Sequence, residues 1–339
     1  MIVLGIESSC DETAAAVVVN GRKILSSVVS SQVNIHRPYG GVVPELASRN
    51  HIKDILPIYR QAIEVAEITE DKVDALAVTQ GPGLIGSLLV GFSFVKAVAM
   101  VLDIPWVGVS HLSGHLNSVF LENDPPAFPF VALLVSGGHT SIYHVTSHTD
   151  SEILGQTRDD AAGEAFDKVA KMLGLGYPGG GVISALAKKG DPLKIQFPRT
   201  YLDKTRFDFS FSGIKTAVNR YVKEHSQDLT NRIADIAAGF QEAVVEVLVY
   251  KVIAAAASTE CNRIALVGGV AANERLRSVM IAEAGKRGLT VHVPSLSFCG
   301  DNAAMIAAAG YHMLKAGYRG RITDDVYSRQ PHSPPTRYA

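Results

Sequence analysis

The sequence is poor in cysteine: Cys10, Cys261 and Cys299 are scattered over 339 residues, and no Cys-x-x-Cys pair occurs. An odd, scattered set argues against a disulfide framework and a thiolate zinc site, and it favours a reducing compartment. A charge excess of either sign is also lacking, since 32 Lys and Arg face 33 Asp and Glu. Any polyanionic partner therefore has to meet a local basic patch or be shared with another subunit.

A phosphate-binding P-loop (Gly-x-x-x-x-Gly-Lys-Ser/Thr) is missing too, which argues against a P-loop enzyme. The start of the chain lacks the basic segment of a secretory signal and already reaches an acid at Glu7, so we expect a cytoplasmic protein. One apolar run, residues 84–102, is long enough to cross a membrane. Because Ser87, Ser93 and Lys96 interrupt it, we expect a helix packed inside an α/β core and no membrane partner.

Two histidines four residues apart come directly after an apolar, strand-like run at 104–109. If a helix starts at Ser110, His111 and His115 share one of its faces, as two ligands of one metal ion would. Exposed or capping histidines have the same spacing, so that alternative stays open. A zincin peptidase carries glutamate after its first histidine, whereas this chain has Leu112, so a metal site here is not the usual peptidase site.

Two acids are candidates for ligand binding. Asp301 follows the loop 294–300 and precedes an expected helix at 303–316. It is either the N-cap of that helix or the third ligand of a His-His-Asp site with open coordination positions. Asp167 lies one turn inside a helix expected to begin at the acids Asp159 and Asp160. A side chain one turn inside a helix is poorly placed to cap its N-terminus, which favours a role for Asp167 in binding a ligand.

The strand pattern at the start of the chain recurs in the middle. Apolar runs at 2–6 and 14–19 flank a polar turn, and runs at 130–135 and 141–145 flank a second turn. Strands alternating with helices follow, so the sequence predicts a duplicated, two-lobed α/β protein. Further strands are expected at 23–29, 74–79, 104–109, 263–267 and 290–293, with helices at 44–66, 84–102, 274–287 and 303–316.

Glycine-rich turns after strands are candidate phosphate contacts, because adjacent glycines let a ligand approach the backbone N–H groups. Ser136-Gly137-Gly138 and Gly268-Gly269 fit this pattern, with Asn273 as a nearby donor and acceptor. Ordinary hairpin turns are the alternative. Between residues 188 and 223, basic side chains alternate with aromatic ones, which indicates either an RNA surface or solvated helix faces.

Taken together, these motifs resemble the TsaD (Gcp/YgjD) family of tRNA N6-adenosine threonylcarbamoyltransferases, over about residues 1–325. The resemblance is carried by the segments Gly5 to Thr13, Gly41 to Arg49, Gly81 to Leu84, His111 to His115, Leu134 to Thr140, Phe209 to Thr216 and Gly268 to Asn273.

The resemblance implies the actin/hexokinase/Hsp70-like (ASKHA) fold, a duplicated α/β architecture with a nucleotide cleft between its lobes. We expect an N-terminal lobe at 1–110, completed by a C-terminal helix at 303–325, and a C-terminal lobe at 111–302. A loosely ordered tail is expected at 326–339. The implied reaction is transfer of threonylcarbamoyl from threonylcarbamoyl-AMP to N6 of adenosine 37, in tRNAs reading codons that begin with A, with release of AMP.

Site residues follow from the same resemblance. His111, His115 and Asp301 would hold one metal ion, iron first and zinc as the alternative. Asp11 and Glu12 match acids that the family needs for activity, and we expect Asp11 to help remove the N6 proton. The adenylate would be bound by Leu134, Val135, Ser136, Gly137, Gly138, Asp167, Gly180 and Asn273. Implied partners are tRNA and TsaB-like and TsaE-like proteins.

The chain departs from the family pattern at Gly181 and Ser184, where many members have proline and an acid. Three rival functions remain. A metallopeptidase is disfavoured by the missing glutamate beside the histidines. A small-molecule kinase or ATPase of the same fold normally binds Mg·ATP without a histidine pair. A non-catalytic scaffold would be unaffected by substitutions in the site.

Overall fold

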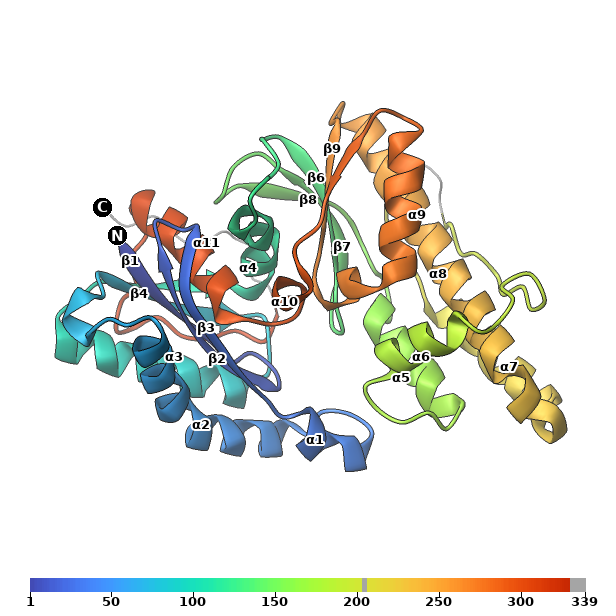
Figure 1. Cartoon of the computed structure of the whole chain (residues 1–339), viewed down its shortest axis with the longest axis horizontal. Coiled ribbons are helices and arrows are strands. Elements are labelled where there is room, and N and C mark those ends of the chain that lie inside the picture. Colours follow the sequence, from blue (N-terminus) through green and yellow to red (C-terminus); the bar gives the residue numbers. More distant parts are fainter. Residues whose placement is uncertain (203–205, 330–339) are drawn as a thin grey trace. The chain divides into compact units, whose positions relative to one another are not determined.

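The computed structural model describes residues 1–202 and 206–329 (Figure 1). The chain forms two compact units, one made of Met1–Pro125 and Asp301–Ala339 and the other of Pro126–Gly300. The lobe boundaries expected at 110/111 and 302/303 stay a prediction, because a compact unit is not by itself an independently folding domain. Of the expected tail 326–339, residues 330–339 lie outside the described part of the chain.

In the first unit, five strands form one mixed sheet in the order β3-β2-β1-β4-β5. The first three strands run antiparallel as a meander, while β1, β4 and β5 run parallel. Their bounds are Ile2–Glu7 for β1, Glu12–Val19 for β2, Lys23–Ser31 for β3, Ala75–Gly81 for β4 and Trp106–Ser110 for β5.

Helices cover both faces of this sheet (Figure 1). Leu4 and Ile6 of β1 belong to the core formed with α2 (Pro44–Val65) and α3 (Ile85–Leu102). Gly5 faces the other way: a Cβ there would lie 2.4 Å from the carbonyl oxygen of Ala303, at the start of α11 (Ala303–Lys315). Strands covered on both faces are apolar along their whole length, which explains the nearly uniform apolar run of β1.

The second unit repeats this plan with strands in the order β10-β9-β6-β7-β8. Again three strands form an antiparallel meander, β6-β7-β8, and two strands, β9 and β10, run parallel to the first. The same order in both sheets confirms the predicted duplicated α/β architecture. The strand bounds are Phe130–Val135 for β6, Thr140–Val145 for β7, Ser151–Gln156 for β8, Arg263–Val267 for β9 and Thr290–His292 for β10.

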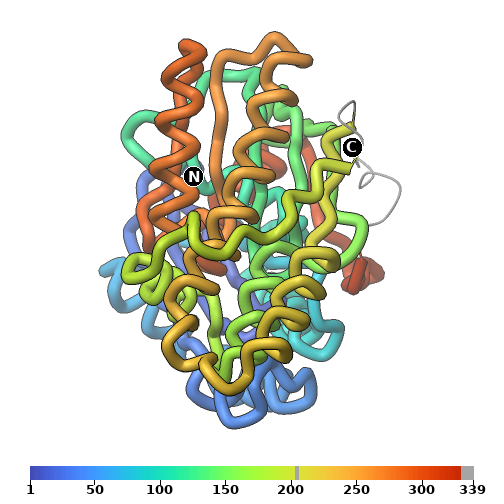
Figure 2. Tube along the Cα trace, turned by 90° about the vertical axis from the view of Figure 1, so that its right-hand side faces the viewer, coloured from blue at the N-terminus to red at the C-terminus, as the bar shows by residue number. Residues whose placement is uncertain are grey.

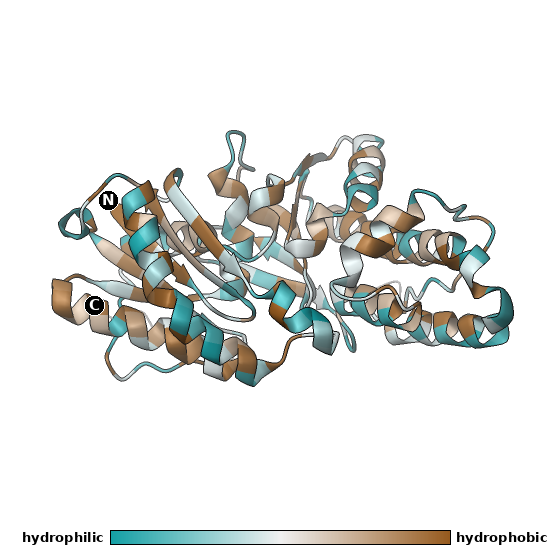
Figure 3. Ribbon diagram, turned by 60° about the horizontal axis from the view of Figure 1, so that its bottom comes forward, coloured by the Kyte–Doolittle hydropathy of each residue, from teal (hydrophilic) through white to brown (hydrophobic). Residues whose placement is uncertain are grey.

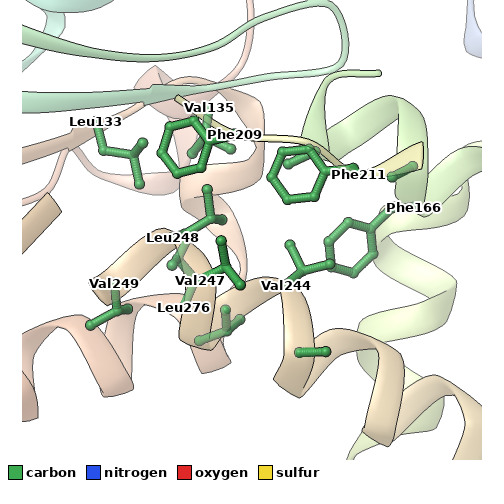
Figure 4. Close-up of a cluster of buried hydrophobic side chains, with 14 of the residues drawn as sticks. Leu133, Val135, Phe166, Phe209, Phe211, Val244, Val247, Leu248, Val249 and Leu276 are labelled. Atoms are coloured by element: carbon green, nitrogen blue, oxygen red, sulfur yellow. The ribbon is translucent and has the colours of Figure 1, made fainter. Parts of the chain in front are cut away.

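The core of the second unit is built on α8 (Leu229–Ser258), a helix that the sequence-based assignment omits. It runs side by side with α9 (Glu274–Gly285), as Figures 1 and 2 show. Phe209 and Phe211 lie over α8, with their ring centroids 6.0 Å apart (Figure 4). The remaining helices of this unit are α5 (Ala162–Met172), α6 (Gly179–Ala187), α7 (Ser212–Glu224) and the short α10 (Leu296–Cys299).

Within the described chain, α3 is the one helix long and apolar enough to cross a membrane. It packs against α2 and β4 through one face, which buries Leu88 and Phe92. The other face leaves Met100 and Val101 exposed, so the helix is less enclosed than the sequence predicts. The ribbons of this unit carry both brown apolar and teal polar segments, as expected of helices that pack by one side (Figure 3).

His312 of α11 makes the stability of the first unit depend on pH. Burial lowers its pKa to about 4, whereas a histidine in the unfolded chain titrates near about 6.5. Below pH 6.5 the unfolded chain binds a proton that the folded chain does not, so the stabilisation is complete above about pH 6.5 and is lost as the pH falls toward 4. We expect His312→Gln to remove this dependence. Urea unfolding of both proteins between pH 7.5 and pH 4.5 measures it, and parallel stability–pH curves would contradict it.

Candidate metal centre and nucleotide pocket

The structure brings His111, His115 and Asp301 together. Strand β5 ends at Ser110, and α4 (His111–Asn117) begins at once, so both rings leave the first turns of one helix. Nε2 of His111 lies 3.5 Å and Nε2 of His115 lies 3.2 Å from Oδ1 of Asp301. The ring centroids are 4.7 Å apart. The alternative of exposed histidines is wrong, because both side chains are buried.

Asp301 is also not the cap of the helix that follows it. That position belongs to Asn302, whose side-chain oxygen accepts a hydrogen bond from the backbone N–H of Met305 at 3.0 Å. The capping alternative for Asp301 is therefore wrong. Because Asn302 caps the N-terminus of α11, the carboxylate of Asp301 is left to contact the two histidines.

A third acid, Glu7, lies behind His111 and was not singled out from the sequence. It is fully buried at the end of β1, and its Oε2 accepts a hydrogen bond from Nδ1–H of His111 at 3.0 Å. The Thr79 hydroxyl and the backbone N–H of Ser9 donate to the same carboxylate, at 2.6 and 2.5 Å. One signal was available: Glu7 is the single charged residue of an otherwise apolar strand.

The pKa shifts in the cluster follow from these contacts. Burial alone would lower the pKa of His111, but the charges of Asp301 and Glu7 outweigh burial and raise that pKa to about 9. Burial would raise the pKa of Glu7, yet His111 and the hydrogen bonds to it and to Thr79 leave that pKa lowered. Glu7 is therefore an ionised carboxylate, and without a metal His111 is a cation that donates from Nδ1 to Glu7 and faces Asp301 with Nε2. A metal ion at Nε2 would displace one proton, and Glu7 would then hold the remaining proton on Nδ1.

The donor set fits a divalent transition metal. Ligand atoms at about 2.1 Å from one ion lie roughly 3–3.5 Å apart, as the two imidazole nitrogens do from the carboxylate oxygen. Two histidines and one carboxylate suit iron(II) or zinc and leave coordination positions open. A carboxylate that accepts the second N–H of a ligand histidine, here Glu7, is the usual support of such sites. Position 112, where a zincin has its catalytic glutamate, is a buried leucine, so the site lacks that carboxylate.

Glu7→Gln tests the support that Glu7 gives to His111. The variant keeps the shape of the side chain but removes the charge that orients the ring, so we expect the affinity for Zn²⁺ or Co²⁺ to fall about 10–100-fold. Isothermal calorimetry with the metal alone measures this. Glu45→Gln, on the exposed start of α2, is the matched control and should bind metal as the wild type does. Equal affinities for all three proteins would contradict the role of Glu7.

The turn between β1 and β2 carries the two acids expected to act in catalysis. Asp11 and Glu12 are both largely buried there. Burial, with the charges of Asp301 and Asp11, raises the pKa of Glu12 to about 9, so Glu12 is protonated at neutral pH and hydrogen-bonds to Asp11. The pair therefore holds a proton close to the metal ligands.

His51 of α2 holds this turn in place and was also missed from the sequence. Its Nε2–H donates to the carbonyl oxygen of Cys10 at 3.0 Å, and its Nδ1 accepts from the hydroxyl of Thr13 at 2.8 Å. Burial lowers the pKa of His51, which keeps the ring neutral, as both bonds require. His51 thus joins the two ends of the segment that contains Asp11 and Glu12.

The second unit contains a separate pocket of about 410 Å³ beside the β6–β7 turn. Its walls come from that turn, from α5 and α6 and from the segment after β9. Gly163 lets α5 approach the turn, since a Cβ there would lie 2.5 Å from the carbonyl oxygen of Ser136. The residues that line it include Gly137, Gly163, Asp167, Gly180, Gly181, Ser184, Lys188, Gly269 and Asn273.

Four of the eight residues expected to bind the adenylate line this pocket: Gly137, Asp167, Gly180 and Asn273. Asp167 also accepts a hydrogen bond from the backbone N–H of Gly179 at 2.7 Å, at the start of α6. Asn273 caps α9 by accepting from the N–H of Leu276 at 3.0 Å, and its amide donates to Gln241.

The other four residues lie in or next to strand β6. Leu134 and Val135 are fully buried in β6, backbone included, so neither is open to a ligand. The hydroxyl of Ser136 accepts a hydrogen bond from the backbone N–H of His139 at 3.1 Å. Gly138 has no atom within 4 Å of the position of a Cβ. The assignment of all eight residues to the adenylate stays a prediction.

Of the eight basic residues that the structure describes between 188 and 223, five pair with acids, while Lys204 lies outside the described residues. Lys188 pairs with Glu274, Lys194 with Asp235, and Lys215 with Asp160. Arg199 pairs with Glu246. The helix expected to begin at Asp159 begins at Ala162 instead, and Asp159 accepts hydrogen bonds from the N–H groups that open α7. Ion pairs and caps therefore account for much of this composition.

The sequence was compared with known families and proteins. The profile of the TsaD family, tRNA N6-adenosine threonylcarbamoyltransferase, matches residues 23–308. A protein of that name from Desulforapulum autotrophicum is 61% identical over 329 residues, which are 97% of this chain and 99% of the relative. Another from Desulfotalea psychrophila is 54% identical, over 97% of each chain.

Two solved structures share the fold at much lower sequence identity. Full-length HypF in its phosphate- and nucleotide-bound form matches with a TM-score of 0.62 at 14% identity, over 93% of this chain and 46% of HypF. Component A of (R)-2-hydroxyglutaryl-CoA dehydratase from Acidaminococcus fermentans matches with a TM-score of 0.57 at 15% identity, over 93% and 99%. At such identities the likeness shows the fold alone, and it agrees with the predicted ASKHA fold.

Proposed function

Because this chain belongs to the TsaD family of tRNA N6-adenosine threonylcarbamoyltransferases, and is therefore a transferase, we propose its reaction in detail. It carries the threonylcarbamoyl group from threonylcarbamoyl-AMP to N6 of adenosine 37, in tRNAs that read codons beginning with A, and releases AMP. The convergence of His111, His115 and Asp301 is the observation that carries this proposal, since the residues that match the family's metal ligands meet in space.

The acyl donor is already activated as a mixed anhydride, so the reaction needs no protein nucleophile. It needs a site that holds the donor beside a weakly nucleophilic amine and stabilises the charge that develops on the leaving AMP. The pocket of about 410 Å³ lies within the range of about 300–1,000 Å³ typical of small-molecule sites. Gly137 and Gly269 at its edge offer backbone N–H groups to phosphate oxygens, and Asn273 offers an amide.

His111, His115 and Asp301 hold one metal ion in this proposal, iron(II) first and zinc as the alternative. Bound there, the ion supplies Lewis acidity that can orient the donor and offset negative charge. Glu7 keeps Nδ1 of His111 protonated and its Nε2 available as a ligand. Both histidine rings are buried, so little water reaches the side of the site that they form.

The acids of the β1–β2 turn take the proton that N6 loses. Asp11 is the acceptor in this proposal, and Glu12, neutral because burial and nearby charges raise its pKa to about 9, hydrogen-bonds to it. A general base of this kind contributes about 10²–10⁴-fold to the rate. His51 keeps the turn in position through its bonds to Cys10 and Thr13.

TsaB-like and TsaE-like proteins are the proposed partners, in the cytoplasm. The net charge of −1 supports tRNA binding that is shared among subunits. Helices α2 and α3 pack together and expose the apolar side chains Ile52, Leu56, Ile85 and Leu89. A surface of this kind is suited to a protein partner.

The proposed reaction is tested by mass spectrometry of tRNA nucleosides after incubation with threonylcarbamoyl-AMP, the metal-loaded chain and its partners. We expect threonylcarbamoyl-adenosine in a tRNA that reads a codon beginning with A. The same tRNA with guanosine at position 37 is the matched control and should stay unmodified. Equal amounts of product with and without the chain would refute the proposal.

Asp11→Ala tests the proton acceptor. We expect the rate of transfer to fall about 10²–10⁴-fold while metal affinity stays unchanged, since Asp11 is not a ligand. Single-turnover kinetics with saturating donor measure the chemical step. Turnover equal to that of the wild type would end the assignment of Asp11.

A further inference from the structure

The segment that leads to an exposed turn starts next to Asp11 and Glu12. Strand β3 pairs with β2 so that Ser31 lies opposite Glu12, and the Ser31 hydroxyl donates to the Glu12 carboxyl group at 3.2 Å. The backbone N–H of Gln32 donates to the carbonyl oxygen of Asp11 at 3.0 Å. The chain then leaves the sheet through α1 (Val33–His36) and a single 3₁₀ turn, Arg37–Tyr39 (Figure 1).

This turn is anchored from within by a buried histidine. His36 is fully buried, its Nε2–H lies 3.3 Å from the Gln32 side-chain oxygen, and its Nδ1 accepts from the backbone N–H of Val43 at 3.3 Å. Gly40 closes the turn in the left-handed region, at φ 68°. The segment is therefore held in one shape although its outer residues face water.

The two residues displayed by the turn are a cation and an aromatic ring. Tyr39 is 62% exposed, and Arg37 is exposed beside it. Among the residues that the structure describes, neither the Arg37 guanidinium nor the Tyr39 hydroxyl has a hydrogen bond or an ion pair. Packing of the turn does not explain this pair of side chains, since both are exposed.

We propose that the Arg37–Tyr39 turn binds the anticodon loop of the tRNA substrate, with Tyr39 stacking on an unpaired base next to adenosine 37 and Arg37 contacting a backbone phosphate. This inference rests on the proposed function, because the turn follows within seven residues of Ser31 and Gln32, which bond to the acids proposed to act on N6. RNA loops are recognised by unstacked bases lying on aromatic rings, and arginine pairs well with phosphate. A turn already held by His36 loses little freedom on binding.

Tyr39→Ala, Tyr39→Phe and Arg37→Ala separate stacking from charge. We expect Tyr39→Ala to raise the KM for tRNA about five- to hundredfold, as loss of one base–aromatic stack does, while the KM for threonylcarbamoyl-AMP is unchanged. Tyr39→Phe keeps the ring and should restore tRNA binding. Arg37→Ala should reduce the slope of log K against log salt by about 0.7, the value for one phosphate contact with a single strand.

Arg60→Ala is the matched control, since Arg60 is an exposed arginine of α2 that also lacks an ion pair among the described residues. It should leave both the KM for tRNA and the salt slope as in the wild type. Fluorescence anisotropy with an anticodon stem-loop RNA gives the affinities directly, and thermal unfolding checks that each variant is folded.

The outcomes distinguish the inference from the function on which it rests. If the wild type modifies tRNA and Tyr39→Ala does so with unchanged KM for tRNA, the docking surface is overturned while the function stands. If Tyr39→Ala instead weakens binding of a protein partner and not of the stem-loop RNA, the turn is a protein contact and the inference is also overturned. If the wild type modifies no tRNA, the proposed function itself fails.

Discussion

Replacing His111 by alanine is expected to abolish metal binding and threonylcarbamoyl transfer together. The substitution removes one of three ligands and also the partner of the buried Glu7 carboxylate. Loss of a partner behind a ligand already lowers metal affinity about 10–100-fold, so loss of the ligand itself should exceed about a hundredfold. Calorimetry with Zn²⁺ and the nucleoside assay with iron-loaded protein measure the two effects.

Two further variants keep this prediction testable. His111→Gln retains a donor toward Glu7, which protects the fold should His111→Ala unfold, and it should still lose the metal. His225→Ala, at the end of α7 in the second unit, removes a histidine that lies outside the cluster and should bind metal normally. If His111→Gln binds and transfers as the wild type does, the His-His-Asp cluster is not the site of the metal.

A bulky side chain at Gly180 is expected to close the nucleotide pocket. Gly180 lies in the first turn of α6, lines the pocket, and has no atom within 4 Å of the position of a Cβ. The ring in Gly180→Phe can therefore enter the pocket proposed for the donor without a clash in the fold. We expect the KM for threonylcarbamoyl-AMP to rise about a hundredfold or more, equivalent to about 2.7 kcal/mol of lost binding free energy.

Gly285→Phe is the matched control for this substitution. Gly285 ends α9, also has open space at its Cβ, and is not among the residues that line the pocket. Kinetics at varied donor concentration compare the two variants with the wild type, and metal affinity should be normal in both. An unchanged KM for Gly180→Phe would place the donor elsewhere.

Local pattern was enough to predict much of the fold. The spacing of apolar residues and the turn at Asn20-Gly21 predicted the first meander, and α2 was expected at 44–66 where it spans Pro44–Val65. The repeat of a strand–turn–strand pattern predicted the duplication because each copy is local in sequence. Helix α8 was missed because it is buried along much of its length, and a helix buried on most faces has little amphipathic period.

The candidate site was predictable only as far as single segments allow. The spacing of His111 and His115 is local, and it correctly indicated one helix face. The bond between Glu7 and His111 joins residues 104 positions apart, so no periodicity reveals it. The role of Asp301 could not be decided from the sequence either. Asp301 and Asn302 are both good N-cap residues, and only the backbone geometry shows that Asn302 caps α11.

The identical strand order in the two sheets makes the β1–β2 turn and the β6–β7 turn counterparts of each other. Carboxylates cluster at one counterpart and glycines at the other, so one repeated plan presents two different chemistries. If the proposed roles hold, substitutions among the acids of the first turn leave anion binding at the second turn unchanged. Exchanging the two turn sequences would therefore erase both specialisations while leaving the hairpins themselves intact.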